Sequence, residues 1–324
     1  MKNIIFTLIF LLVFGLSITH AQQVYIAGGD GGNSWVGGNP VYWVNGKQTV
    51  LPKIGEGANA NAITVSDSDI CIAGFDDGYG VVYWLNGKEQ YLFKGLGTAF
   101  RIFGDAAISE IVGYAGNNAV YWSGANYRGL VKTELPKKSK EAVANAMASS
   151  GSKRYITGSD GDDAVYWVLE KKGYNYNIKQ TVLPKKSKMA RALAIAISGS
   201  KIYIAGTDGD DAVYWLNGKR TVLPKTGTSA STSGIAVSGS NVYIVGTDGD
   251  DAVYWLNGNQ TVLPRAGTYA RANGIAVSGS NIYIVGTDGD PDVNADAVYW
   301  LNEKRTVLPK TNKSANANAI FVTP

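Results

Sequence analysis

Acidic side chains alternate along a short stretch near the C-terminal end of the chain. Asp288, Asp290, Asp292, Asn294 and Asp296 place an oxygen-bearing side chain at every second position of this stretch. A hard cation such as Ca²⁺ takes about six to eight oxygen ligands, and acids spaced around a tight turn can supply several of them. The stretch therefore predicts a calcium site, with a solvated acidic turn as the alternative.

This stretch resembles the calcium loops of EF-hands and of integrin propellers at loop positions one, three, five and nine. It departs from that pattern at Val293, which stands where the pattern has a turn-making glycine. No glutamate closes the loop at its twelfth position. Both departures favour the alternative of an acidic turn without a bound ion.

Shorter acidic loops recur earlier in the chain, and each is followed by a cation. The candidate ligand-binding residues of two such copies are Asp208, Asp210, Asp211 and Lys225, and Asp248, Asp250, Asp251 and Arg265. These groups could form rim ion pairs, each worth about 0–1 kcal/mol, since Asp-Gly also makes turns without any ligand. Alternatively, repeated loops on one face form several weak sites that together bind a multivalent surface.

Trp35 is a further candidate for ligand contact. It lies in the glycine-rich segment from Gly28 to Asn39, and it is the one tryptophan outside the repeated Val-Tyr-Trp motif. Because tryptophan offers a large apolar face with a polar edge, Trp35 is expected either to stack on a sugar ring or to cover apolar surface.

The chain is poor in the residues that most often carry nucleophilic catalysis. Its single histidine, His20, falls in the N-terminal segment that we expect to be removed, and its single cysteine, Cys71, is expected to be buried. The commonest pairings of nucleophile and base are therefore absent from residues 22–324. A non-catalytic protein is predicted, although paired carboxylates leave glycoside hydrolysis as an alternative.

All these residues are positioned by one sequence unit that occurs seven times. Val-Tyr-Trp ends at residues 43, 84, 122, 167, 215, 255 and 300, at spacings of 38 to 48 residues, which is typical of propeller blades. Each copy contains four short strands rich in valine, isoleucine and tyrosine, with Asn-Gly turns that favour tight hairpins. The Leu-Pro-Lys ending places the fourth strand at an exposed edge, because proline is tolerated only there.

The two ends of the chain predict how the ring closes. Residues 24–27 match a second strand of the unit, whereas residues 317–322 match a first strand. The predicted fold is therefore all-β: a seven-bladed β-propeller of four-stranded antiparallel blades, closed by the C-terminal strand joining the N-terminal blade. Residues 22–324 are expected to form this single domain.

The repeated Ala-Val-Tyr-Trp-Leu-Asn-Gly and Thr-Val-Leu-Pro-Lys segments resemble those of secreted bacterial β-propeller repeat proteins over the whole of residues 22–324. Residues 1–21 read as a signal peptide, with Lys2 followed by an apolar run and small residues at the end. Export is therefore predicted, to the periplasm or the extracellular space, with no membrane insertion. Loss of Lys2 lowers the formal charge from +4 to +3, which gives no support to nucleic-acid binding.

Together these observations predict a secreted binding protein, lectin-like or adhesive, that engages glycans or a cell-surface polymer through the loop face of the ring. The alternative is a structural scaffold that docks a protein partner without a small-ligand site. A glycan-active enzyme is the less favoured class. No cofactor is required, and calcium is the one candidate ion.

Overall fold

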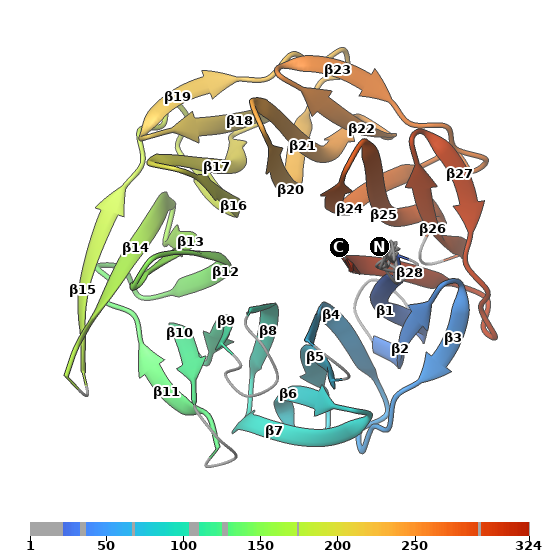
Figure 1. The fold of residues 1–324 in the computed structure, drawn as a ribbon, viewed down its shortest axis with the longest axis horizontal. Coiled ribbons are helices and arrows are strands. Elements are labelled where there is room, and N and C mark those ends of the chain that lie inside the picture. The colour runs from blue at the N-terminus through green and yellow to red at the C-terminus, as the bar shows by residue number, and fades with distance from the viewer. Residues whose placement is uncertain are drawn as a thin grey trace, which may run out of the picture.

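The computed structural model describes residues 22–32, 37–66, 69–103, 110–124, 129–173, 175–290 and 293–323. Every regular element in these ranges is a strand, and the 28 strands form a ring of seven blades (Figure 1). The described residues include no helix with the length and apolarity needed to cross a membrane. The predicted signal peptide, residues 1–21, lies outside the described residues and stays a prediction.

The strands of each blade are given from the channel outward. Blade 1 contains β28 (Ala315–Val322), β1 (Val24–Gly32), β2 (Gly37–Val44) and β3 (Lys47–Val50). Blade 2 contains β4 (Ala58–Ser66), β5 (Asp69–Asp76), β6 (Gly80–Leu85) and β7 (Lys88–Lys94). Blade 3 contains β8 (Gly97–Phe103), β9 (Glu110–Ala115), β10 (Asn118–Ser123) and β11 (Val131–Glu134).

The remaining four blades repeat this order. Blade 4 contains β12 (Ala142–Ser150), β13 (Lys153–Asp160), β14 (Asp163–Lys172) and β15 (Asn175–Val182). Blade 5 contains β16 (Ala190–Ser198), β17 (Lys201–Asp208), β18 (Asp211–Leu216) and β19 (Lys219–Val222). Blade 6 contains β20 (Ala230–Ser238), β21 (Asn241–Asp248), β22 (Asp251–Leu256) and β23 (Asn259–Val262), and blade 7 contains β24 (Ala270–Ser278), β25 (Asn281–Asp290), β26 (Asn294–Leu301) and β27 (Lys304–Val307).

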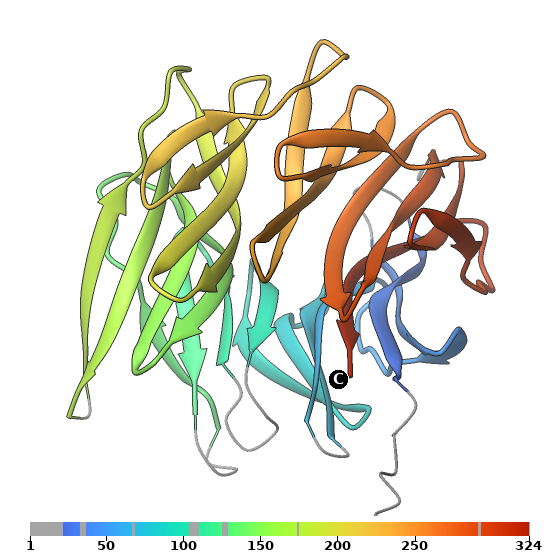
Figure 2. The ribbon, with the colours of Figure 1, turned by 45° about the horizontal axis from the view of Figure 1, so that its top comes forward.

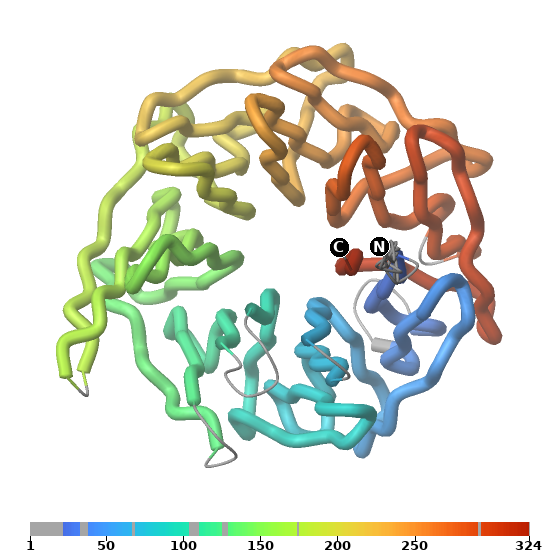
Figure 3. The backbone as a smooth tube through the Cα atoms, in the orientation of Figure 1, coloured from blue at the N-terminus to red at the C-terminus, as the bar shows by residue number. Residues whose placement is uncertain are grey.

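The ring closes as the sequence predicts. The C-terminal strand β28 pairs antiparallel with β1, in a register that runs from Val24 opposite Val322 to Asp30 opposite Ala315. The red end of the chain thus returns to lie beside its blue start (Figures 2 and 3). Blades 1 and 2 are additionally joined by a single pair, Gly38 with Ala58. The predicted all-β, seven-bladed fold is confirmed.

A buried tryptophan lies on the third strand of each blade, and in six of the seven blades it ties that blade to the one before it. All seven repeat tryptophans are fully buried. In blade 6, the indole Nε1 of Trp255 donates to the carbonyl of Pro224, at 2.8 Å, in the segment that crosses from blade 5. The same bond joins Trp43 to Pro309, Trp84 to Pro52, Trp167 to Pro136, Trp215 to Pro184 and Trp300 to Pro264. The repeated Leu-Pro segment therefore supplies a carbonyl as well as a strand end.

Blade 3 lacks this bond. Trp122 Nε1 is buried without a hydrogen-bond partner among the described residues. Phe93 takes the place of the proline before blade 3, and it lies within β7, which runs on to Lys94 and stays paired with β6. One net hydrogen bond is worth about 1 kcal/mol, and an orphaned buried N–H costs rather than contributes. Trp122→Phe should therefore lower the free energy of unfolding by about 1 kcal/mol less than Trp255→Phe does. Urea unfolding of the two variants measures this difference, and equal losses would contradict it.

Two smaller predictions are also confirmed. Cys71 is buried and forms no disulfide. The Asn-Gly turns have the left-handed dihedral angles of tight hairpins, with φ of 49° at Asn217 and 84° at Gly218. The Asn217 side chain also accepts a hydrogen bond from the Ile202 N–H at 2.9 Å, which ties the turn to the second strand of its blade.

Candidate functional site

The ring has two faces. The loop face carries the turns between second and third strands together with the crossings between blades, and the predicted acidic ligands that the structure describes lie there. The opposite face carries the remaining hairpin turns. The predicted acids fall into separate groups on the loop face, according to what their carboxylates contact.

In six of the seven blades, an aspartate at or near the end of the second strand points into the protein. Asp208 is fully buried, and its carboxylate accepts hydrogen bonds from the backbone N–H of Lys186 at 2.7 Å and of Ser187 at 2.8 Å. Both donors belong to the crossing that enters the same blade. The same pattern occurs at six positions, which we call the clamp aspartates: Asp30, Asp76, Asp160, Asp208, Asp248 and Asp288.

Hydrogen bonds lower the pKa of the clamp aspartates Asp208 and Asp248. Burial alone would raise the pKa of Asp208, but the bonds from Lys186 and Ser187 and the charge of Arg220 outweigh burial and hold that pKa below its usual value. The pKa of Asp248 is lowered in the same way, by Thr226, Gln260 and Gly227 against the effect of burial. These carboxylates serve the junctions between blades, and they face away from solvent.

The last acid of each loop pairs with the cation that opens the next crossing. Asp211 lies 2.9 Å from Lys225, and Asp251 lies 2.8 Å from Arg265. Lys225 also donates to the carbonyls of Asp210 and Thr228, at 2.8 and 3.0 Å. The middle acids, Asp210 and Asp250, are exposed at the turns. These contacts correspond to the rim ion pairs of the first interpretation.

The predicted calcium loop is a β-hairpin in which Asp290 pairs with Asn294. Asp288 accepts hydrogen bonds from the Ala266 and Gly267 N–H groups and from Arg305, and Lys310 lies 2.8 Å from Asp296 and 3.0 Å from the Asn294 side-chain oxygen. Asp292 lies outside the described residues. Within the described ranges, no group of three or more His, Cys, Asp or Glu residues is arranged to hold a metal ion. Calcium binding at this loop stays a prediction.

Trp35 also lies outside the described residues, which resume at residue 37 after the first part of blade 1. Its proposed contact with a sugar ring stays a prediction.

The central channel contains chemistry that the sequence analysis did not single out. Its wall consists of the first strand of every blade: β4, β8, β12, β16, β20, β24 and β28. These strands contain three arginines, Arg101, Arg191 and Arg271, and no aspartate or glutamate. In a chain with 26 acidic residues, a wall that is basic without any acid is a distinct chemical environment.

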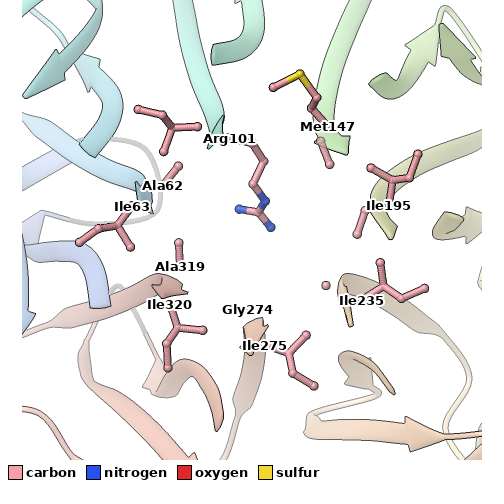
Figure 4. Close-up of a pocket in the computed structure, with 14 residues that line it drawn as sticks. Ala62, Ile63, Arg101, Met147, Ile195, Ile235, Gly274, Ile275, Ala319 and Ile320 are labelled. Atoms are coloured by element: carbon pink, nitrogen blue, oxygen red, sulfur yellow. The ribbon is translucent and has the colours of Figure 1, made fainter. Parts of the chain in front are cut away.

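Arg101 breaks the repeat inside this channel. At the bulge of each first strand, the residue equivalent to Arg101 is alanine or glycine: Ala62, Ala146, Ala194, Gly234, Gly274 and Ala319. The side chain of Arg101 extends into the middle of the ring (Figure 4). It reaches from blade 3 to blade 6, where its Nη2 lies 3.5 Å from the Ser233 carbonyl, while its Nη1 lies 3.3 Å from the Phe100 carbonyl.

Two cavities meet at Arg101. The loop-face cavity has a volume of about 290 Å³ and is lined by Asn61, Phe100, Arg101, Asn145, Leu193, Thr232, Ser233, Asn273 and Asn318. The inner cavity, of about 180 Å³, lies among the ring of isoleucines beyond Arg101, which includes Ile63, Ile195, Ile235 and Ile275. Burial lowers the pKa of Arg101, because a charged guanidinium is solvated poorly there.

A girdle of polar side chains surrounds the loop-face cavity. Asn61 donates to the Ala99 carbonyl of the next blade at 3.1 Å, and Asn145 donates to the Ala192 carbonyl at 2.9 Å. Asn273, Asn318 and Ser233 make the equivalent bond to the blade that follows each of them. Phe100 and Leu193 take the same position in blades 3 and 5 and bring apolar surface to the cavity.

The signal for this site was present in the sequence. Alignment of the seven first strands, rather than of the Val-Tyr-Trp strands, shows one arginine against six small residues. The conspicuous repetition of the acidic loops drew the interpretation to the rim instead.

The sequence matches no protein-family model and none of the curated proteins. Among solved structures, the chain is similar to the "putative 6-phosphogluconolactonase" of Bacteroides uniformis, with 9% identity, a TM-score of 0.58 and coverage of 93% of this chain and 99% of that one. A Lactobacillus plantarum protein has 13% identity and a TM-score of 0.60, with coverage of 94% of this chain and 99% of that one. Apo AztD of Citrobacter koseri has 12% identity and a TM-score of 0.53, with coverage of 93% of this chain and 97% of that one. At such identities the likeness supports the β-propeller fold alone.

Proposed function

We propose that this protein is a secreted, non-catalytic binding protein that holds a saccharide, or the end of a cell-surface polymer, in the loop-face cavity of its central channel. The observation that carries the proposal is Arg101. The other blades have alanine or glycine at this position, whereas blade 3 has an arginine whose side chain extends into a cavity. Ligand sites on symmetric scaffolds are found where the symmetry is broken for chemistry.

The chemistry of the cavity suits a ligand rich in hydroxyl groups. Each girdle asparagine has two N–H donors and a carbonyl acceptor, and the bond to the next blade uses one donor. Asn318 also donates to the Asn59 side chain, which leaves its carbonyl oxygen as acceptor. Each amide therefore retains capacity for a hydroxyl. Phe100 adds an aromatic surface against which the apolar face of a sugar ring can pack.

The same wall supports binding rather than turnover. The seven first strands contain no histidine, cysteine, aspartate or glutamate, so they bring no residue that commonly serves as a general acid or base into the channel. The carboxylates of the loop face nearest to it are occupied as clamps and ion pairs.

A glycan array with the purified protein tests this proposal, together with a variant that fills the cavity. Leu193 lines the cavity and takes the place of a girdle residue without making the girdle bond, so Leu193→Trp adds bulk without removing that bond. We expect Leu193→Trp to abolish the glycan signals of the wild type. The control variant Asp210→Ala with Asp250→Ala changes exposed loop acids and should leave the signals intact.

The result can separate the alternatives. Loss of signal in the loop control alone would place the site on the rim. Absence of any glycan signal from the folded wild type would overturn the saccharide proposal and favour a scaffold for a protein partner.

A further inference from the structure

We propose that the group held at Arg101 is an oxyanion, so that the saccharide or polymer bound in the channel is an acidic one. This inference rests on the proposed function for the position of the ligand, and it adds the chemical class that the site selects. Carboxylate, sulfate and phosphate share this chemistry, since each presents two or more oxygens to a guanidinium.

The first argument is the unmet charge of Arg101. Guanidinium remains protonated in proteins, and a charge inside a protein is normally paired. Among the described residues, no carboxylate forms an ion pair with Arg101, and its two contacts are carbonyl oxygens at 3.3 and 3.5 Å. A guanidinium has five N–H donors, so most of its hydrogen-bonding capacity faces the cavities.

Other partly buried arginines of the same chain show what a structural arginine looks like here. Arg154 lies 2.7 Å from Glu110, Arg220 lies 2.6 Å from Asp208, and Arg305 lies 2.6 Å from Asp288. Each of these three has a carboxylate supplied by the protein. An oxyanion from outside would give Arg101 the same kind of partner, a charged oxygen group that accepts from its guanidinium.

The second argument is the entrance to the channel. Arg191 on β16 and Arg271 on β24 are exposed near the loop-face end of the wall. Each alternates with buried alanines along its strand, so its side chain lies on the same strand face as the residues that line the cavity. Arg271 lies over the Tyr269 ring, with its guanidinium carbon 5.8 Å from the ring centroid. Because the wall strands contribute arginines and no acid, the charges of the wall itself favour anions over cations at this entrance.

The chain itself provides a variant that should fold. Arg101→Ala restores the residue present at the same bulge in blades 2, 4, 5 and 1, namely Ala62, Ala146, Ala194 and Ala319. It removes a charge that has no counter-ion among the described residues, so we expect its melting temperature without added anions to equal or exceed that of the wild type. A loss of binding in this variant is then not explained by unfolding.

The experiment has two arms at fixed ionic strength. In the first, melting temperature is measured as chloride is replaced by acetate, sulfate or phosphate; the wild type should rise with at least one of them, and Arg101→Ala should not. In the second, calorimetry compares an oligogalacturonate with a neutral malto-oligosaccharide. Arg101→Ala should weaken oligogalacturonate binding by about 10- to 100-fold, as expected for a charge-assisted hydrogen bond.

Further variants distinguish a fork-shaped site from a general positive field. Arg101→Lys keeps the charge and loses the two parallel donors, so it should recover only part of the affinity. Arg191→Gln with Arg271→Gln should change affinity by a few-fold and flatten the dependence on salt, because these residues act at a distance.

The outcomes separate this inference from the function on which it rests. Glycan binding that prefers neutral chains, or that is unchanged in Arg101→Ala, would overturn the inference and keep the function. Stabilisation by simple anions through Arg101 without any saccharide binding would keep the anion site and overturn the saccharide function. An anion response that is identical in wild type and Arg101→Ala, or absent from both, would overturn the anion site.

Discussion

Glu89→Gln should raise the melting temperature by a few degrees at pH 8 and change it little at pH 4.5. Glu89 lies on β7, at the position where Gln48, Gln180 and Gln260 donate to the clamp aspartates of their own blades. A carboxylate has no proton to donate. In blade 2, therefore, Glu89 and the clamp aspartate Asp76 face each other as two acids.

Glu89 and Asp76 can form a hydrogen bond only if one of the two carboxyl groups keeps a proton. Burial, the charge of Asp76 and a hydrogen bond to Asp76 raise the pKa of Glu89 from 4.5 to about 7. Between these two pH values, the unfolded chain has lost the proton that the native protein still binds. The stability associated with this proton is fully present below pH 4.5, falls as the pH rises, and is lost above about pH 7.

The size of the effect follows from the same shift. A shift of this extent would correspond to roughly 3 kcal/mol for a fully buried group, but Glu89 is partly exposed, and solvent screening reduces the figure to about 1–2 kcal/mol. Glutamine restores the donor found in the other blades at every pH. Thermal melts between pH 4.5 and 8 test this, because the wild type should lose stability relative to Glu89→Gln across that range.

The chain offers a matched control for this prediction. Gln48→Glu introduces the same pair of acids beside Asp30 in blade 1 and should lower the melting temperature at pH 8. Parallel pH profiles for the wild type and Glu89→Gln would show that the proton is not shared as described.

Asp30→Ala should destabilise the ring by about 3–5 kcal/mol. Asp30 is fully buried in blade 1 and accepts hydrogen bonds from the Thr311 N–H at 2.8 Å, the Thr311 hydroxyl at 2.7 Å, the Asn312 N–H at 2.9 Å and Gln48 at 2.9 Å. Alanine leaves these donors without an acceptor at the junction where the chain closes on itself. Losses of this kind are among the largest that a single substitution produces.

The pH dependence of this clamp has the opposite sign to that of Glu89. Burial opposes the ionisation of Asp30, but the bonds from Thr311, Gln48 and Asn312 outweigh it and hold the pKa of Asp30 below 3.8. Its contribution is therefore present above about pH 4 and is lost as the pH falls through the lowered pKa. The destabilisation by Asp30→Ala should be full at pH 7 and shrink in strong acid.

Urea unfolding measures the loss, and hydrogen exchange localises it to β28 and the Thr311–Asn312 crossing. Asp210→Ala is the control, because its side chain is exposed on a loop of the same face, and its effect should stay below about 0.5 kcal/mol. A change of less than 1 kcal/mol in Asp30→Ala, or unaltered exchange in β28, would contradict the assigned role of this clamp.

The architecture could be predicted well because the same strand and turn signals recur in successive copies of the repeat. The Val-Tyr-Trp strands, the Asn-Gly turns and the split first blade each agreed with the ring, and the structure confirms them. Consistency between local and global signals is what makes such a fold readable.

The chemistry was less readable, because residue type does not reveal which way a side chain points. Asp208 and Asp210 are two residues apart in one acidic loop, yet the first is buried as a clamp and the second is exposed. Arg101 takes a position where the other blades have alanine or glycine, and its contact with Ser233 across the channel became visible only in the structure.

The junction between blades 2 and 3 has a mechanical consequence. Ala115 stands opposite Gly97 where the other blades have a clamp aspartate opposite their first residue, and Trp122 lacks the proline carbonyl. The seven junctions share any load around the ring in series, and this one retains the Asn61–Ala99 hydrogen bond and apolar packing around residues such as Val81, Ala99 and Trp122. The ring is therefore expected to open first at this junction. Opening there would expose the side of blade 3, the blade that carries Arg101.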